Sequence, residues 1–317
     1  MKKSIALVAL AFGVTNAFAQ DLTSKKGEPI LPEAGDWGVA VDATPFLNYA
    51  GNFFGKTANN TAPTWNFFTG GQTITGKYFV DAQTAYRGSL RIGLNSNTSR
   101  NMVTDQLKAA ALSFTANGFP DPLPVVENKW KRSNTVIGLA AGIEKRKGKT
   151  RLQGYYGGEL GIYMDMQKDK FTYGNTLAAT SSASTNVNVT ASDAFTGVTN
   201  VDAAAPIAGL IGSARATEIK RGTIFSFGVR GFIGAEYFVL PKMSIGGEFG
   251  WGLGISSMGK SSTTWEFVGD NGNPSNTTNS VGTATIEGAK NNSFWLDTDG
   301  YNSVFGPTGS LRLNFYF

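Results

Sequence analysis

Apolar and polar residues alternate one by one along several stretches of the chain, among them its end. Leu311, Leu313, Phe315 and Phe317 share one face of an extended strand, and Ser310, Arg312, Asn314 and Tyr316 share the other. A period of two is typical of a strand whose faces meet different surroundings. A terminal Phe opposite the polar face suits a strand with one face in lipid and the other in a polar lumen.

The same alternation predicts seven more strands upstream. Their expected ranges are 36–48, 72–80, 85–96, 133–146, 150–164, 222–239 and 243–257. The clearest is 243–257, where Ile245, Phe249, Trp251, Leu253 and Ile255 oppose Ser244, Glu248 and several glycines. Pro45 lies inside the first range, and it predicts a bulge there or the outer margin of that strand.

The connections between these strands alternate strictly in length. Residues 81–84, 146–149 and 240–242 are short, whereas 49–71, 97–132, 165–221 and 258–307 are long, with a short helix expected within 102–114. Outer-membrane barrels have short periplasmic turns and long extracellular loops. The predicted fold is therefore all-β, a closed antiparallel eight-stranded transmembrane β-barrel with both termini in the periplasm. Ten strands remain an alternative if 264–268 and 283–287 also enter the membrane.

The amino terminus has the features of an export signal. Lys2 and Lys3 precede an apolar run over 5–14, and a small-x-small cleavage site ends at Ala19. We expect a signal peptide at 1–19, a periplasmic segment without a fold of its own at 20–35, and the barrel at 36–317. The apolar run is too short to cross a bilayer as a helix.

The composition removes several classes of chemistry. The chain has no Cys and no His, which excludes disulfides and removes the commonest zinc ligands and the commonest general base. We predict no catalytic, cofactor-binding or metal-binding residues and no enzyme activity. The formal charge of +5 includes Lys2 and Lys3, so the mature chain is only mildly basic and nucleic acid is not an expected partner.

Charged residues of both signs gather on the predicted inward faces. They are Asp42, Lys77, Arg87, Arg91, Glu144, Arg151, Glu159, Arg230, Glu236, Glu248 and Arg312. Eight strands leave an interior just wide enough for side chains, and an isolated buried charge is costly. We therefore expect a structural ion-pair network that plugs the lumen. The alternative is a proton- or ion-conducting path, since many inward glycines leave space for water.

Aromatic residues are frequent in the long connections. They are Phe53, Phe54, Trp65, Phe67, Phe68, Trp265, Phe267, Phe294 and Trp295. Two interpretations stay open. They form a surface for protein or glycan recognition, or they belong to the aromatic girdle at the membrane interface and to packing between loops.

Parts of the sequence resemble a known group of proteins. The terminal Phe315 and Phe317 resemble the signal that the barrel assembly machinery reads in bacterial outer-membrane barrels. Gly76-Lys77-Tyr78-Phe79, a short turn, and the strand after it resemble periplasmic hairpins of small Bacteroidetes barrels. Together with the leader and the strand pattern, the chain resembles small barrels of the OmpX, OmpW and OmpA-transmembrane type. That resemblance implies the outer membrane of a Gram-negative bacterium, in contact with its lipid and lipopolysaccharide.

Three classes of function remain. The first is a structural or surface-interaction barrel that acts through its extracellular loops, or an accessory subunit of an outer-membrane complex. The second is a narrow porin for small or hydrophobic solutes. The third is an enzyme that works without His, because the small barrel proteases, lipid A acyltransferases and deacylases use a catalytic His that this chain lacks.

Overall fold

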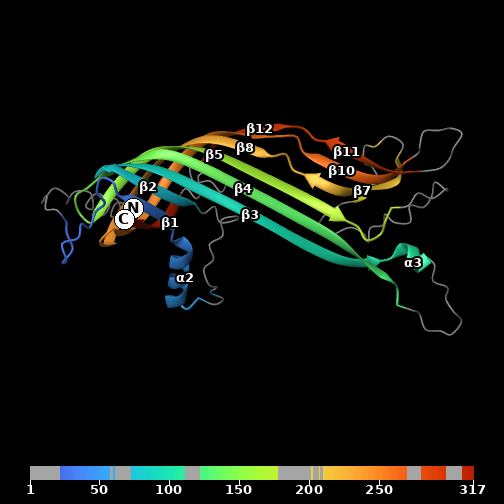
Figure 1. Ribbon diagram of the computed structural model, residues 1–317, viewed down its shortest axis with the longest axis horizontal. Coiled ribbons are helices and arrows are strands. Elements are labelled where there is room, and N and C mark those ends of the chain that lie inside the picture. The colour runs from blue at the N-terminus through green and yellow to red at the C-terminus, as the bar shows by residue number, and fades with distance from the viewer. Residues whose placement is uncertain are drawn as a thin grey trace, which may run out of the picture.

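The computed structural model describes residues 22–57, 60, 73–110, 122–177, 201–202, 207, 210–269, 280–297 and 309–317. Within these ranges the chain is all-β with two short helices, and its strands pair in antiparallel ladders (Figure 1). No helix of the described part is long and apolar enough to cross a membrane. The predicted all-β class is confirmed.

Eight of the strands form a hydrogen-bonded ring. In order around it they are β1 (Trp37–Asp42), β2 (Ile74–Asp81), β3 (Thr84–Thr104), β4 (Val125–Lys147), β5 (Leu152–Thr172), β8 (Ile224–Leu240), β9 (Met243–Met258) and β13 (Gly309–Tyr316). β13 pairs back onto β1, with Val39 opposite Phe315 and Val41 opposite Leu313. Each ring strand overlaps one predicted strand. The alternation of apolar and polar residues that predicts the strand also fixes which of its faces points inward.

Several strands continue beyond the ring into what we call the tall sheet. The far halves of β3, β4 and β5 stay paired up to Thr104 and Thr172, and the sheet goes on through β7 (Leu210–Lys220), β10 (Ser262–Gly269) and β11 (Ser280–Glu287) (Figure 1). The two-residue β6 (Val201–Asp202) pairs with β7. β12 (Asn291–Asp297) pairs with the far half of β9, beyond the stretch that β13 occupies.

The tall sheet corrects the expected strand ends and loops. The expected loops 97–132, 165–221 and 258–307 contain paired strands, because neighbouring strands satisfy their backbone groups even where no apolar face marks them. The segments of the ten-strand alternative do pair with each other, with Thr264 opposite Thr285. They stand outside the ring, however, so the ring itself has eight strands.

The first predicted strand is also too long. β1 ends at Asp42, and helix α2 (Thr44–Phe54) begins where a strand is expected to continue. Pro45 lies in the first turn of this helix, where its missing N–H costs no hydrogen bond. It therefore marks the outer margin of the strand and not a bulge. The short helix expected within 102–114 exists as α3 (Gln106–Ala110), although its first expected residues still belong to β3.

The opposite end of the ring, which we call the turn end, carries the tight connections β2–β3, β4–β5 and β8–β9. Gly148 adopts φ of 123° in the second of them, a backbone conformation that favours glycine. Residues 22–36 fold over this end instead of forming a lead-in without structure. Ile30 is 1% exposed and packs against Phe79, Phe238 and Tyr316. Its carbonyl accepts a hydrogen bond of 3.1 Å from the Lys242 N–H. The predicted signal peptide lies outside the described residues.

Candidate functional site

The ring has polar residues inside and apolar residues outside. Its exposed outward side chains include Leu90, Ile92, Leu139, Ile143, Leu160, Ile162, Phe227, Val229, Ile233, Leu253 and Ile255, which we call the apolar belt. Its buried inward side chains include Thr75, Ser89, Gln153, Ser226, Ser244 and Asn314. Single exposed apolar residues are ordinary, but a continuous band of them marks a surface that meets another apolar phase.

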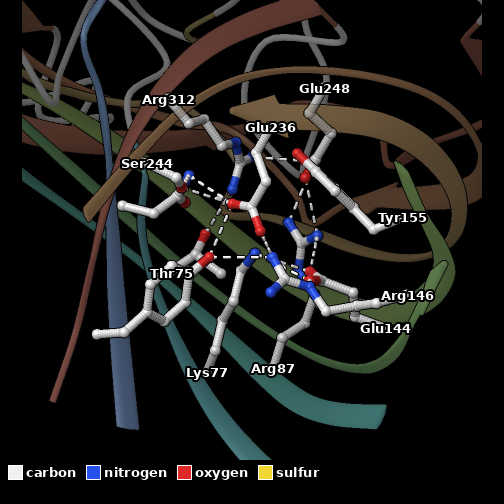
Figure 2. Close-up of polar contacts among 12 residues, drawn as sticks. Thr75, Lys77, Arg87, Glu144, Arg146, Tyr155, Glu236, Ser244, Glu248 and Arg312 are labelled. Atoms are coloured by element: carbon white, nitrogen blue, oxygen red, sulfur yellow. Dashed lines mark hydrogen bonds and ion pairs between the residues drawn. The ribbon is translucent and has the colours of Figure 1, made fainter. Parts of the chain in front are cut away.

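Charged side chains at the centre of the ring form the interior network (Figure 2). Its cations are Lys77, Arg87, Arg146, Arg230 and Arg312, and its carboxylates are Glu144, Glu159, Glu236 and Glu248. Each of these residues is at most 5% exposed. Because charges this deeply buried are tolerated only when they are paired, the network depends on its geometry.

Glu248 on β9 is the carboxylate that joins most of the network. Arg87 binds it through both terminal nitrogens, with Nη1–Oε2 at 2.8 Å and Nη2–Oε1 at 3.1 Å. Arg230 Nη1 lies 2.8 Å and Arg312 Nη2 3.1 Å from its Oε1. This two-pronged contact of Arg87 is the strongest and most directional arrangement open to a guanidinium and a carboxylate. Glu248 thus ties β3, β8 and β13 together across the interior.

The other carboxylates share these cations and, through Glu144 and Glu236, extend the network toward the turn end. Glu159 pairs with Arg230 at 2.9 Å and with Arg87 at 3.3 Å. Glu144 accepts from Lys77 Nζ at 3.0 Å and from Arg146 Nε at 3.1 Å. Arg146 continues the chain of contacts in an ion pair with Glu236.

Neutral groups complete the shell around Glu236. Its Oε2 accepts hydrogen bonds from Ser244 Oγ at 2.7 Å, Tyr316 OH at 2.8 Å and Asn314 Nδ2 at 3.0 Å. These donors come from β9 and β13. Strand β13 is thereby anchored at several points inside the ring as well as through its backbone ladder.

Aromatic rings lie against several of the interior cations. The guanidinium of Arg87 lies 4.0 Å from the ring centre of Phe232, and Lys77 Nζ lies 4.9 Å from that of Tyr155. Arg146 lies 5.0 Å from the ring centre of Phe79. Such cation–π contacts stabilise a desolvated cation without bringing in another charge.

At two inward glycines, Gly250 and Gly254, a neighbouring side chain takes up the space that the missing Cβ leaves. A Cβ built on Gly250 would lie 2.5 Å from Arg230 Nε, and one built on Gly254 would collide with the ring of Trp295. Trp295 donates from Nε1 to Ser256 Oγ at 3.2 Å, and Ser256 shares a hydrogen bond of 2.7 Å with Ser226. Large side chains from neighbouring strands therefore occupy the volume that these glycines make available.

Most of the predicted inward charges lie in the interior network, and three do not. Arg91 is 8% exposed and lies over the ring of Tyr163, with its guanidinium 5.6 Å from the ring centre. Asp42 is half-buried at the end of β1, opposite Arg312 in the ladder. Arg151 precedes β5 and donates to the carbonyls of Phe238 at 3.0 Å and Val239 at 3.2 Å, so it ties a turn instead of entering the interior.

Sequence reasoning missed two members of the site. Arg146 falls within a run of basic residues, 145–149, that is expected to be a turn, although its spacing of two from Glu144 places both on one face. Phe232 shares the face of Arg230, but an aromatic residue does not stand out as part of a polar interior. Because alternate residues of a strand share a face, counting by twos from Glu144 and from Arg230 would have placed both residues inside the ring.

The C-terminal residues of the predicted assembly signal lie on the outside of the ring. Phe315 is 41% and Phe317 is 71% exposed. The backbones of Phe317 and Trp37 exchange two hydrogen bonds, at 2.8 and 2.9 Å. The last residue of the chain is thus paired directly with the first residue of β1, where β13 and β1 meet.

The tall sheet has a small core of its own on the face that continues the ring interior. Trp130, Phe171, Ala216 and Trp265 pack together there. Asp169 accepts hydrogen bonds of 2.7 Å from both Trp130 Nε1 and Arg132 Nε. The stacked rings and the charged pair hold these strands in register well beyond the apolar belt.

The aromatic residues of the long connections have different surroundings. Trp265 belongs to the core of the tall sheet and Trp295 to the ring interior, whereas Phe53, Phe54 and Phe294 are exposed. Phe267 is half-buried. The remaining three, Trp65, Phe67 and Phe68, lie outside the described residues. The six described members therefore do not share one continuous surface.

No family model, curated protein or solved structure matches the chain. Within the described ranges, no group of three or more His, Cys, Asp or Glu is placed to hold a metal ion. What the site can do must therefore be argued from its own geometry.

Proposed function

We propose that the chain is an integral outer-membrane protein whose ring is a closed transmembrane β-barrel with a plugged lumen. The observation that carries this proposal is the inverted polarity of the ring, with the apolar belt outside and the interior network inside. Exposing apolar surface to water costs about 25 cal/mol per Å², and a surrounding bilayer removes that cost. Only helices and closed barrels satisfy their backbone groups within lipid.

The uneven ends of the ring support one orientation in the membrane. Short turns belong on the periplasmic side and long segments outside the cell. The turn end, together with residues 22–36 that cover it, then faces the periplasm. The tall sheet stands outside the cell, and both ends of the chain lie in the periplasm.

The protein acts, in this proposal, as a surface-interaction barrel or as an accessory subunit of an outer-membrane complex. The tall sheet supports this role because its own core and its ladders make it an ordered platform above the membrane. The filled interior weighs against the narrow porin, since Arg230 and Trp295 occupy the space over the glycines and Ile30 covers the turn end. Purification in mild detergent tests for a bound partner.

Single cysteines test the membrane topology, and the absence of native Cys leaves no background. Thr172→Cys in the tall sheet should react with an impermeant thiol reagent on intact cells, and Lys147→Cys at the turn end should not. Both residues are exposed, so both variants should react after the outer membrane is permeabilised. Labelling of Lys147→Cys with protection of Thr172→Cys on intact cells would reverse the barrel and refute the proposed orientation.

Conductance tests the plug separately. The purified protein in a planar bilayer should give little steady current, because paired side chains fill the lumen. A control on the same preparation must show that the protein is folded and inserted, as a gel band whose mobility changes on heating. Stable open channels from the wild-type protein would overturn the plug and favour the narrow porin.

A further inference from the structure

A row of lysines lies on the outward face of the tall sheet, just beyond the apolar belt. Lys131 on β4 is directly opposite Lys170 on β5, and Lys168 on β5 is opposite Lys220 on β7. All four are exposed, and we call them the lysine row. They share the outward face with Ile137 and Met164, because residues two apart along a strand point the same way.

The lysine row carries more positive charge than the one carboxylate paired with it, Glu218, can balance. Glu218 pairs with Lys168 at 2.7 Å and with Lys220 at 2.8 Å, and the hydrogen bonds from these two lysines hold the pKa of the Glu218 carboxyl below its ordinary value. Lys170 lies between Lys131 on β4, a like charge that destabilises the ladder, and Glu218 on β7, which already pairs with two other lysines. An anion on this face would turn that repulsion into attraction.

An apolar groove of about 730 Å³ lies on the same outward face, between the lysine row and the middle of the belt. Ile137, Leu139, Ile162, Met164, Phe225 and Phe227 contribute its apolar walls. From Met164 to Lys168 is four residues of strand, or about 13 Å at the usual rise, and to Lys170 it is six residues, or about 20 Å. One amphiphile could therefore place an apolar chain in the groove and an anionic group on the lysine row.

We propose that this surface binds a phosphate-bearing glycolipid of the outer leaflet, of the lipopolysaccharide type. An acyl chain occupies the groove, and the phosphates of the sugar headgroup lie on the lysine row. This inference rests on the proposed function, because the groove meets lipid only if the ring spans the membrane. The order of apolar groove and then cations matches the order of chain and then charged headgroup at a membrane surface.

The experiment measures binding of fluorescent lipid A to the folded full-length protein in neutral detergent. The double variant Lys131→Gln/Lys170→Gln should bind about 30-fold more weakly, since a lysine near an anionic lipid surface contributes about 1 kcal/mol. The matched control Lys147→Gln/Lys149→Gln removes the same charge at the turn end and should bind as the wild type does. Lipid A without phosphates should show the same loss with the wild-type protein.

Three results would overturn the inference. They are equal binding by the lysine-row variant and the control, equal binding of lipid A with and without phosphates, and displacement of the lipid by inorganic phosphate at matching concentration. The third would identify a site for free anions. Insertion into vesicles, checked by the heat-dependent gel shift, distinguishes a failure of the proposed transmembrane barrel from a failure of the proposed lipid site. A chain that fails to insert contradicts the proposed function itself, whereas one that inserts without a preference for phosphate contradicts only this inference.

Discussion

Replacing Glu248 should destabilise the protein far more than replacing Arg312, although the two form an ion pair. The interior network contains five cations and four carboxylates, so it already has one more positive than negative charge. Glu248→Gln widens that imbalance, and Arg312→Gln removes it. If only the broken Glu248–Arg312 ion pair counted, both substitutions would lower the free energy of unfolding by the same amount.

The contacts that remain decide the magnitude. Without Glu248, Arg87 and Arg230 keep Glu159, but the hydrogen-bond partners left to Arg312 are the hydroxyls of Ser310 and Thr75, each at 3.0 Å, with the half-buried Asp42 opposite it in the ladder. Leaving one buried charge without its counter-charge costs about 3–5 kcal/mol. Arg312→Gln loses hydrogen bonds to neutral hydroxyls while Glu248 keeps two guanidinium partners, so we expect about 1–2 kcal/mol.

Urea unfolding of the folded protein in detergent micelles measures the difference. Both variants should unfold with an unchanged slope, and the midpoint of Glu248→Gln should be clearly the lower. Glu287→Gln, which removes an exposed carboxylate paired with Lys260, should leave the midpoint almost unchanged. Equal losses for the Glu248 and Arg312 variants would refute the charge-balance argument. An unchanged midpoint for Glu248→Gln together with altered ion selectivity would mean that the lumen is wet.

Three further changes test the packing and the assembly of the ring. Gly250→Ala should lower the unfolding midpoint because its Cβ meets the Arg230 guanidinium, whereas Gly247→Ala on the same strand meets open space and should not; equal midpoints would contradict the close fit. Ile30→Ala should cost about 2–4 kcal/mol in the same assay, and no loss would show that the cover over the turn end is not held by this side chain. Phe317→Asp should reduce the amount of folded, heat-modifiable protein in the outer membrane, and normal accumulation would show that the terminal residue is dispensable.

The ring could be predicted from the sequence because both of its surfaces impose a residue type. Each ring strand alternates between an apolar outward face and a polar inward face, so strands such as 243–257 stand out clearly. The tall sheet lacks this contrast, since residues such as Ser96, Thr98 and Arg100 follow Leu94 on the outward face of β3. Its strands are stabilised by pairing with strands that are distant in the sequence. The local pattern of residues does not reveal such pairing.

The sequence predicts which residues point into the ring, but it does not predict which of them form ion pairs with each other. Parity along each strand places Glu159 and Glu248 inside, but only the stagger between strands decides that Arg87 reaches both. The same stagger brings Trp295, from an expected polar loop, over Gly254. These contacts depend on how strands are offset around the whole ring, which is a property of its closure and not of any segment.

The paired interior favours placing the proposed binding activity on the tall sheet instead of in the lumen. A solute crossing the ring would have to displace Ile30 at the turn end and break the contacts of Arg230 with Glu159 and Glu248. Because each broken side of a buried pair costs about 3–5 kcal/mol, the proposed plug would oppose that route. The strands that carry these contacts, such as β3 and β5, run on into the tall sheet. Differences in binding should therefore follow substitutions in the tall sheet and the lysine row, while substitutions in the interior should act first on stability.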